Sequence, residues 1–142
     1  MAEPAPSELL KQLLASHVSV SGWEIHIGIA PDSPDRVIAI ADTIGLDPNP
    51  KYLLDYPACQ IMVRGASSDY INARQEAKTV VDLLLGITSQ DVLGDRLVAV
   101  NMNGSGPYFI GRDESMRPLF AINFALIVEP QVPTGGSNRV AL

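Results

Sequence analysis

The spacing of apolar side chains along the chain switches between a helical and a strand period, and these switches predict its elements. The strongest helical pattern covers residues 69–85. Its apolar stripe consists of Tyr70, Ala73, Ala77, Val80, Val81 and Leu84. Ser68 or Asp69 is expected to cap this helix, and Gly86 is expected to end it.

A shorter helix is expected over residues 7–16, with Ser7 as its N-cap and Glu8 in its first turn. Leucines at helical spacing give it one apolar face: Leu9, Leu10, Leu13 and Leu14. The helix should therefore pack that face against a core.

Alternating apolar and polar positions predict six strands. They cover residues 23–29, 36–42, 59–64, 96–103, 108–112 and 117–129. In the first, Trp23, Ile25, Ile27 and Ile29 are expected to share a buried face. The last is the longest and is apolar on both faces, which favours a central place in a sheet.

Residues 43–57 interrupt this regularity and are expected to form an exposed loop. Four residues that break regular elements fall within it: Gly45, Pro48, Pro50 and Pro57. The loop carries acidic side chains and apolar anchors at Asp47, Asp55, Tyr52, Leu53 and Leu54. We interpret residues 44–56 and the two ends of the chain as candidate contacts with other subunits.

The element order predicts an α+β fold, a mostly antiparallel sheet with helices packed on one face. The last three strands are expected to form an antiparallel meander, with a hairpin turn at residues 104–107. Residues 1–130 are expected to form a single domain with a short flexible N-terminus. Residues 131–142 have linker composition and are expected to be a flexible tail, or an arm that orders on a neighbouring subunit.

The charge content qualifies this picture. Charged residues make up 18% of the 142 residues, below the roughly 25% of an average soluble protein. Such a surface favours oligomerisation over a slightly hydrophobic monomer. The net charge is −6, which argues against tight binding to nucleic acid. An acidic surface can still line a passage through which DNA slides.

The residues suited to catalysis or metal binding are sparse. The two histidines, His17 and His26, lack the cysteine or carboxylate neighbours of a metal site. Cys59 has no evident catalytic partners and is interpreted as a small buried hydrophobe. We therefore expect no cofactor, no metal and no enzymatic activity.

Two stretches carry a family resemblance. The first is residues 56–65, YPACQIMVRG, followed by Asp69 and Tyr70 at the start of the helix. The second is residues 118–124, PLFAINF, after the turn at residues 111–113. Over roughly residues 20–130 the chain resembles the tail-terminator or minor capsid proteins of long-tailed bacteriophages.

This resemblance implies a structural virion protein that is assembled in the bacterial cytoplasm and does not act on a membrane. Members of such a family form a hexameric ring that caps the tail tube protein and joins the head–neck connector. Genomic DNA passes through the centre of the ring. Arg64, Arg112 and Asp113 fall within the resembling stretches, and the two arginines are expected to serve structural ion pairs or subunit contacts.

Two alternatives stay open within and beyond this class. A head-completion or connector protein of the phage neck would share the composition and the surface properties. A small ligand-binding α+β module would need an apolar pocket with converging polar groups.

Overall fold

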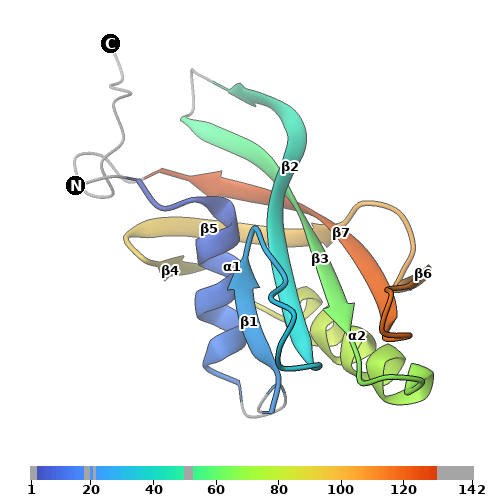
Figure 1. Ribbon diagram of the computed structural model, residues 1–142. Helices are drawn as coiled ribbons and strands as arrows, with labels where there is room; N and C mark the ends of the chain where they lie inside the picture. The colour runs from blue at the N-terminus through green and yellow to red at the C-terminus, as the bar shows by residue number, and fades with distance from the viewer. Residues whose placement is uncertain (1–2, 18–19, 21, 50–52, 131–142) are drawn as a thin grey trace.

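A computed structural model of the protein describes residues 3–17, 20, 22–49 and 53–130 (Figure 1). Its two helices and seven strands follow the order α1 (Pro6–Ala15), β1 (Glu24–Ile27), β2 (Val37–Asn49), β3 (Leu54–Arg64), α2 (Tyr70–Leu85), β4 (Gln90–Val92), β5 (Asp95–Met102), β6 (Tyr108–Arg112) and β7 (Pro118–Glu129). The α+β fold predicted from the sequence is confirmed.

The seven strands form one sheet in the order β1-β2-β3-β7-β5-β4, with β6 beside β7. Among the strand pairs of the described residues, β1–β2 is parallel and the others are antiparallel. β7 lies between β3 on one side and β5 and β6 on the other, which confirms its predicted central place.

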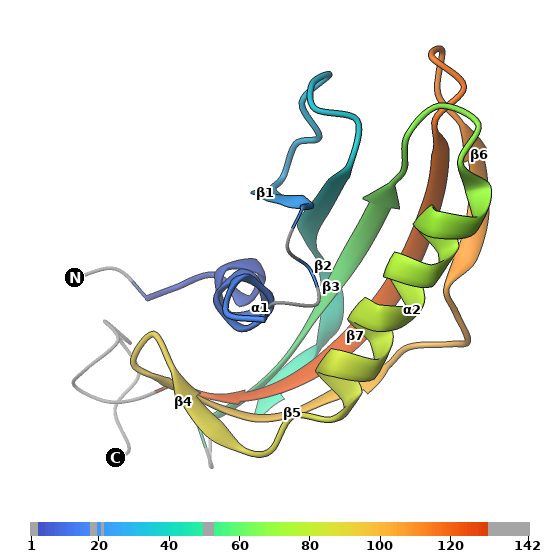
Figure 2. The same cartoon turned by 90° about the horizontal axis from the view of Figure 1, so that it is seen from below.

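Both helices lie inside the curve of the sheet, on the same face (Figure 2). The predicted apolar stripes form the contact: Leu9, Leu10 and Leu14 of α1 and Ala73, Ala77, Val80, Val81 and Leu84 of α2 are all buried. β7 contributes the other side of this core with Phe120, Ile122, Phe124, Leu126 and Val128. The helices and the sheet thus share one continuous hydrophobic core.

The capping of the two helices differs from expectation in one case. Asp69 is the N-cap of α2, where its carboxylate accepts from the Asn72 backbone N at 3.4 Å, and Gly86 ends the helix as predicted. In α1 the predicted N-cap Ser7 is wrong, because the helix begins at Pro6 and its N-cap is Ala5. Ser7 is instead buried within the first turn.

The exposed loop expected at residues 43–57 is also wrong. β2 continues to Asn49 and β3 starts at Leu54, so most of this segment forms a long antiparallel hairpin. Two of the three prolines that favoured a loop, Pro48 and Pro57, fall where the strand register shifts, between the pairs Thr43↔Ala58, Leu46↔Tyr56 and Asn49↔Leu54. Pro50 lies outside the described residues. At such bulges a missing N–H breaks no regular ladder hydrogen bond.

The predicted meander of the last three strands is incorrect in its first half. β5 and β6 both pair with β7, one after the other along the same edge, so residues 104–107 are no hairpin turn. The three-residue β4 was not anticipated, and β2, with 13 residues, is longer than β7, with 12.

The buried face expected in the first strand is correct only at its start. Trp23 and Ile25 pack on the core, but Ile27, the last residue of β1, and Ile29, which lies beyond the strand, are exposed.

Candidate assembly surface

The hairpin of β2 and β3 projects beyond the helices (Figure 1). It holds three of the seven residues proposed as contacts from the sequence: Asp47, Leu53 and Leu54. Asp47 is exposed in β2, Leu54 is half-buried at the start of β3, and Leu53 is half-buried just before it. Tyr52 lies outside the described residues. Asp47 therefore stands on a strand that is held by its partner, not on a loop.

Gly45 allows the two strands of the hairpin to lie unusually close. A Cβ at this position would be 2.0 Å from the backbone O of Tyr56 and 2.8 Å from two backbone atoms of Pro57. Only glycine fits such an approach, because each of these atoms belongs to the backbone and cannot rotate away. The hairpin is therefore a packed element with a fixed shape.

The outer edge of β2 has no strand beside it over its second half. β1 pairs only with Val37 to Ile40, and in the described part of the chain no other strand pairs with that side of residues 41–49. Large apolar side chains on this segment face solvent: Ile44 is 95% and Leu46 is 78% exposed. An unpaired edge with exposed apolar side chains is a surface that invites pairing with another chain.

Two open apolar grooves flank the hairpin. One, of about 380 Å³, lies between the hairpin and the residues before α1, and the other, of about 310 Å³, lies toward β5 and β7. Both are lined by Leu46, Tyr56 and Pro57. The hairpin is thus an apolar ridge between two hollows, a shape suited to a protein partner.

A second apolar edge lies at β6, at the other end of the sheet from the hairpin tip (Figures 1 and 2). Tyr108, Phe109 and Ile110 are exposed on it. Phe109 is anchored by Tyr70 and Phe120, with ring centroids at 5.2 and 5.6 Å. β6 therefore presents apolar side chains on a rigid base.

Charge on this second edge is positive at one place. The Arg112 guanidinium lies 5.3 Å from the Phe109 ring centroid, a cation–π contact. Arg112 is exposed, and no carboxylate among the described residues forms an ion pair with it. Its charge is therefore available to a partner.

Arg64, the last residue of β3, is buried, and β7 lies between it and β6. Its side chain is buried and donates to the backbone oxygens of Asp35, Pro34 and Pro31 at 2.9, 2.7 and 2.5 Å. These bonds fasten the segment between β1 and β2 onto the end of β3. These partners are backbone oxygens and not carboxylates, and the expected ion pair or subunit contact of Arg64 stays a prediction.

Arg117 sits beside Arg64 and was not singled out from the sequence. It is buried, and it bonds Asp113 at 2.7 Å, Asp32 at 3.0 Å and Asp35 at 3.3 Å. Three carboxylates from two distant segments thus offset two neighbouring guanidinium charges. No local sequence pattern predicts that these side chains meet, because Asp32 and Arg117 are 85 positions apart.

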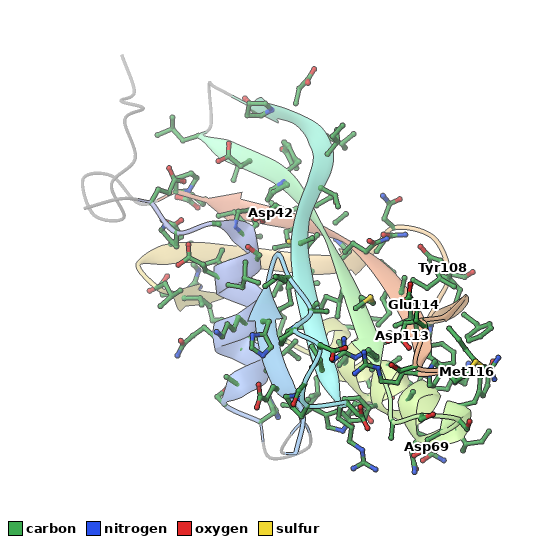
Figure 3. The ribbon with its side chains drawn as sticks, viewed as in Figure 1. Asp42, Asp69, Tyr108, Asp113, Glu114 and Met116 are labelled. Atoms are coloured by element: carbon green, nitrogen blue, oxygen red, sulfur yellow. The ribbon has the colours of Figure 1, made fainter. Side chains whose placement is uncertain are left out.

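Asp113 belongs to this cluster and is not a free surface charge. Figure 3 shows it at the turn between β6 and β7, next to Glu114. Partial burial would raise the pKa of its carboxyl, but hydrogen bonds from the backbone and side chain of Arg117 hold that pKa below its usual range. Its charge stabilises the turn that positions β6.

Comparison with known proteins assigns a family to this arrangement. A family model described as "Bacteriophage tail terminator protein" matches residues 10–130. The chain belongs to the bacteriophage tail terminator family. This tail terminator family member is thus a structural protein of the phage tail, and it assembles with other proteins of the particle.

A solved structure shares the fold of this tail terminator family member. A chain of the "Virion of native gene transfer agent (GTA) particle" superposes with a TM-score of 0.60 at 17% sequence identity. The match covers 88% of this chain and 95% of that chain. No curated protein sequence is significantly similar to this tail terminator family member.

The polar contacts of Asp42 serve the fold of this tail terminator family member. Asp42 of β2 accepts from the backbone N of Ser7 at 2.9 Å and from its Oγ at 2.8 Å, and so caps α1 from a distance (Figure 3). The Cys59 thiol is buried 3.8 Å from the same carboxylate. Burial, and then the charge of Asp42, raise the pKa of this thiol to about 12.

Metal ligands and membrane spans are not found in the described residues. No group of three or more histidine, cysteine or acidic side chains is placed to hold a metal ion there. No helix in the same part of the chain is long and apolar enough to cross a membrane.

Proposed function

We propose that this protein ends the tail tube of a phage-type particle by forming a ring on its head-proximal end. The observation that carries the proposal is the match of residues 10–130 to the tail terminator family. The ring is a hexamer that contacts the tail tube protein on one side and the head–neck connector on the other. It reaches the virion after assembly in the cytoplasm of the bacterial host.

The surface of the chain supports a ring. A closed ring of identical subunits needs two different patches, one on each side of the subunit, that bind each other. The exposed hairpin and the β6 edge are two such patches, and they lie at opposite ends of the sheet. A ring that offers the tube contact on only one of its faces stops further stacking, so the tube ends there.

The charge of the chain supports passage of DNA through the centre of the ring. The net charge of one subunit is −6, and tight binding of a ring of six subunits to the DNA phosphates would need basic clusters that release counterions. An acidic subunit repels the DNA backbone and leaves the DNA free to slide. In this proposal the protein acts through its binding surfaces, without catalysis and without a cofactor.

Residues 1–130 form the ring in this proposal. Residues 131–142 lie outside the described residues, and their role as a tail or as an arm on a neighbouring subunit stays a prediction. Deleting them and measuring ring assembly by native mass spectrometry separates the two, since a contact arm weakens assembly when it is lost.

Polymerisation of the tube protein tests the proposal directly. Purified tube protein is allowed to polymerise with and without this chain, and tube lengths and tube ends are measured by electron microscopy. We expect this chain to form a ring at one end of each tube and to stop growth at that end. Tubes that grow equally at both ends in its presence would contradict the proposal.

A further inference from the structure

We propose that a small polar pocket beside α2 binds a lysine side chain of another protein of the particle. This polar pocket has a volume of about 270 Å³ and is lined by Trp23, Arg36, Asn72, Gln75, Glu76 and Thr79. None of these residues belongs to the hairpin or to the β6 edge. The inference therefore goes beyond the proposed function, because it assigns a contact that is separate from the two ring patches.

Two parts of the chain form the walls of the polar pocket. One wall is a polar face of α2, whose members are three or four positions apart: Asn72, Gln75, Glu76 and Thr79. The other wall comes from residues next to two strands, Trp23 before β1 and Arg36 before β2. The Arg36 guanidinium lies 5.6 Å from the centroid of the Trp23 ring, a cation–π contact that holds this wall together.

Glu76 is the residue of the polar pocket whose hydrogen bonding is incomplete. Its Oε1 is buried and has no hydrogen-bond donor among the described residues. Burial raises the pKa of its carboxyl, and the charge of Arg36 opposes that shift only in part. A carboxylate that has lost water without gaining a donor is unfavourable, and a cation beside it offsets that loss. The polar pocket is thus better suited to a cationic group than to an anionic or a neutral one.

The arginine of the polar pocket does not supply this cation. Arg36 forms its ion pair with Asp69, at 3.9 Å, and Asp69 lies at the start of α2 as its N-cap (Figure 3). Within the described ranges of the chain, no basic side chain forms an ion pair with Glu76. Because the charges of Arg36 and Asp69 offset each other, the carboxylate of Glu76 leaves the polar pocket with a net negative charge.

The size of the polar pocket and the burial of Glu76 favour a lysine ammonium group. Pockets for small organic ligands usually measure about 300–1,000 Å³, so this smaller pocket suits one side chain of a protein. An ammonium group is a compact charge with three donors, whereas a guanidinium group pairs best with both oxygens of a carboxylate. One oxygen of Glu76 is buried, which favours the ammonium group.

Two neighbours of Glu76 can accept the other hydrogens of the ammonium group. The side-chain nitrogen of Asn72 donates to Asp69 at 2.8 Å, which leaves the Asn72 Oδ1 as an acceptor. The Thr79 hydroxyl donates to the backbone oxygen of Gln75 at 3.0 Å, and its oxygen can still accept. The net charge of −6 on the whole chain also favours the approach of a basic partner surface.

A pair of small probes tests the polar pocket in the wild-type chain. The first probe is N-α-acetyl-lysine N-methylamide, and the second is the norleucine analogue, which has a similar side chain without the charge. Trp23 is the one tryptophan of the 142 residues, so its indole N–H gives a single reporter signal in NMR spectra. At constant ionic strength we expect a saturable shift of this signal with the lysine probe, and binding of the norleucine probe that is weaker by about tenfold or more, equivalent to about 1.4 kcal/mol.

Two matched variants test the role of the carboxylate. Glu76→Gln removes the charge and keeps the size of the side chain. Asp82→Asn removes one charge from an exposed position of α2 that does not line the polar pocket, and so it is the control for net charge. We expect Glu76→Gln to weaken binding of the lysine probe by about tenfold and Asp82→Asn to leave it unchanged, with folding of both variants checked by circular dichroism.

Three results would overturn the inference. They are equal affinity for the lysine and norleucine probes, unchanged affinity for the lysine probe in Glu76→Gln, and a Trp23 signal that the lysine probe does not shift. The comparison of the two probes uses the wild-type chain, so it decides the question even where a variant fails to fold. None of these measurements involves the tail tube protein, so failure of the polar pocket leaves the tail-terminator proposal standing.

Discussion

Gly45→Ala tests whether the hairpin is a packed element. The added Cβ would lie 2.0 Å from the Tyr56 backbone oxygen, whereas non-bonded carbon contacts are comfortable near about 3.5 Å. The two strands must therefore separate by about 1.5 Å at this point, which loosens the contacts next to it. Inserting a methyl group into a packed site costs about 1–3 kcal/mol.

The assay is thermal unfolding, followed by circular dichroism. For a chain of this size each kcal/mol lowers Tm by about 3–5 °C, so we expect a decrease of about 3–15 °C. Ile44→Ala is the matched control on the neighbouring residue, because its side chain is 95% exposed and surface changes stay within about 0.5 kcal/mol. An unchanged Tm for Gly45→Ala would refute the close packing of the two strands.

Further predictions concern the polar contacts of the interior. Arg117→Met removes the cation shared by three carboxylates, and we expect a clear loss of stability in urea unfolding, larger than that of Arg112→Met on the surface. The pKa of Asp113 is lowered in the folded state, so the stability that its charge contributes is fully present above its unfolded pKa of about 4 and is lost as the pH falls through its folded pKa. Asp113→Asn should therefore make the free energy of unfolding depend less on pH below about 4. Because the pKa of Cys59 is raised to about 12, its thiol should resist a disulfide reagent at pH 8 in the native protein and react once urea unfolds the chain. Asp42→Ala removes the acceptor for Ser7 and should lower stability by about 1 kcal/mol, as measured by urea unfolding.

The sequence predicted those parts of the fold whose patterns are long and local. The stripe from Ala73 to Leu84 can be buried only as a helix, and the alternation from Phe120 to Val128 can be buried only as a strand. β4 was not predicted because the turn from β4 to β5 contains Leu93 at φ 50°. Turns with this backbone conformation are usually recognised by asparagine or glycine at that position.

The sequence alone does not tell which of the proposed contact residues are exposed in the fold. Asp47 was proposed because it lies in a segment broken by prolines, and Arg112 because it falls within a stretch that carries the family resemblance; both side chains are exposed. Arg64 looked the same in sequence, but its three carbonyl partners come from the distant segment between β1 and β2. Whether a charged side chain faces solvent or a buried partner depends on such long-range contacts, which local patterns do not contain.

The most direct test of the central claim uses a phage-type particle whose gene for this chain carries an early stop codon. The account predicts heads and tails that do not join, with tails that exceed their normal length, and recovery of both defects when the chain is supplied from a plasmid. Electron microscopy of the lysate measures tail length and the fraction of joined particles. Particles with joined heads and tails of normal length in the absence of the chain would contradict the account.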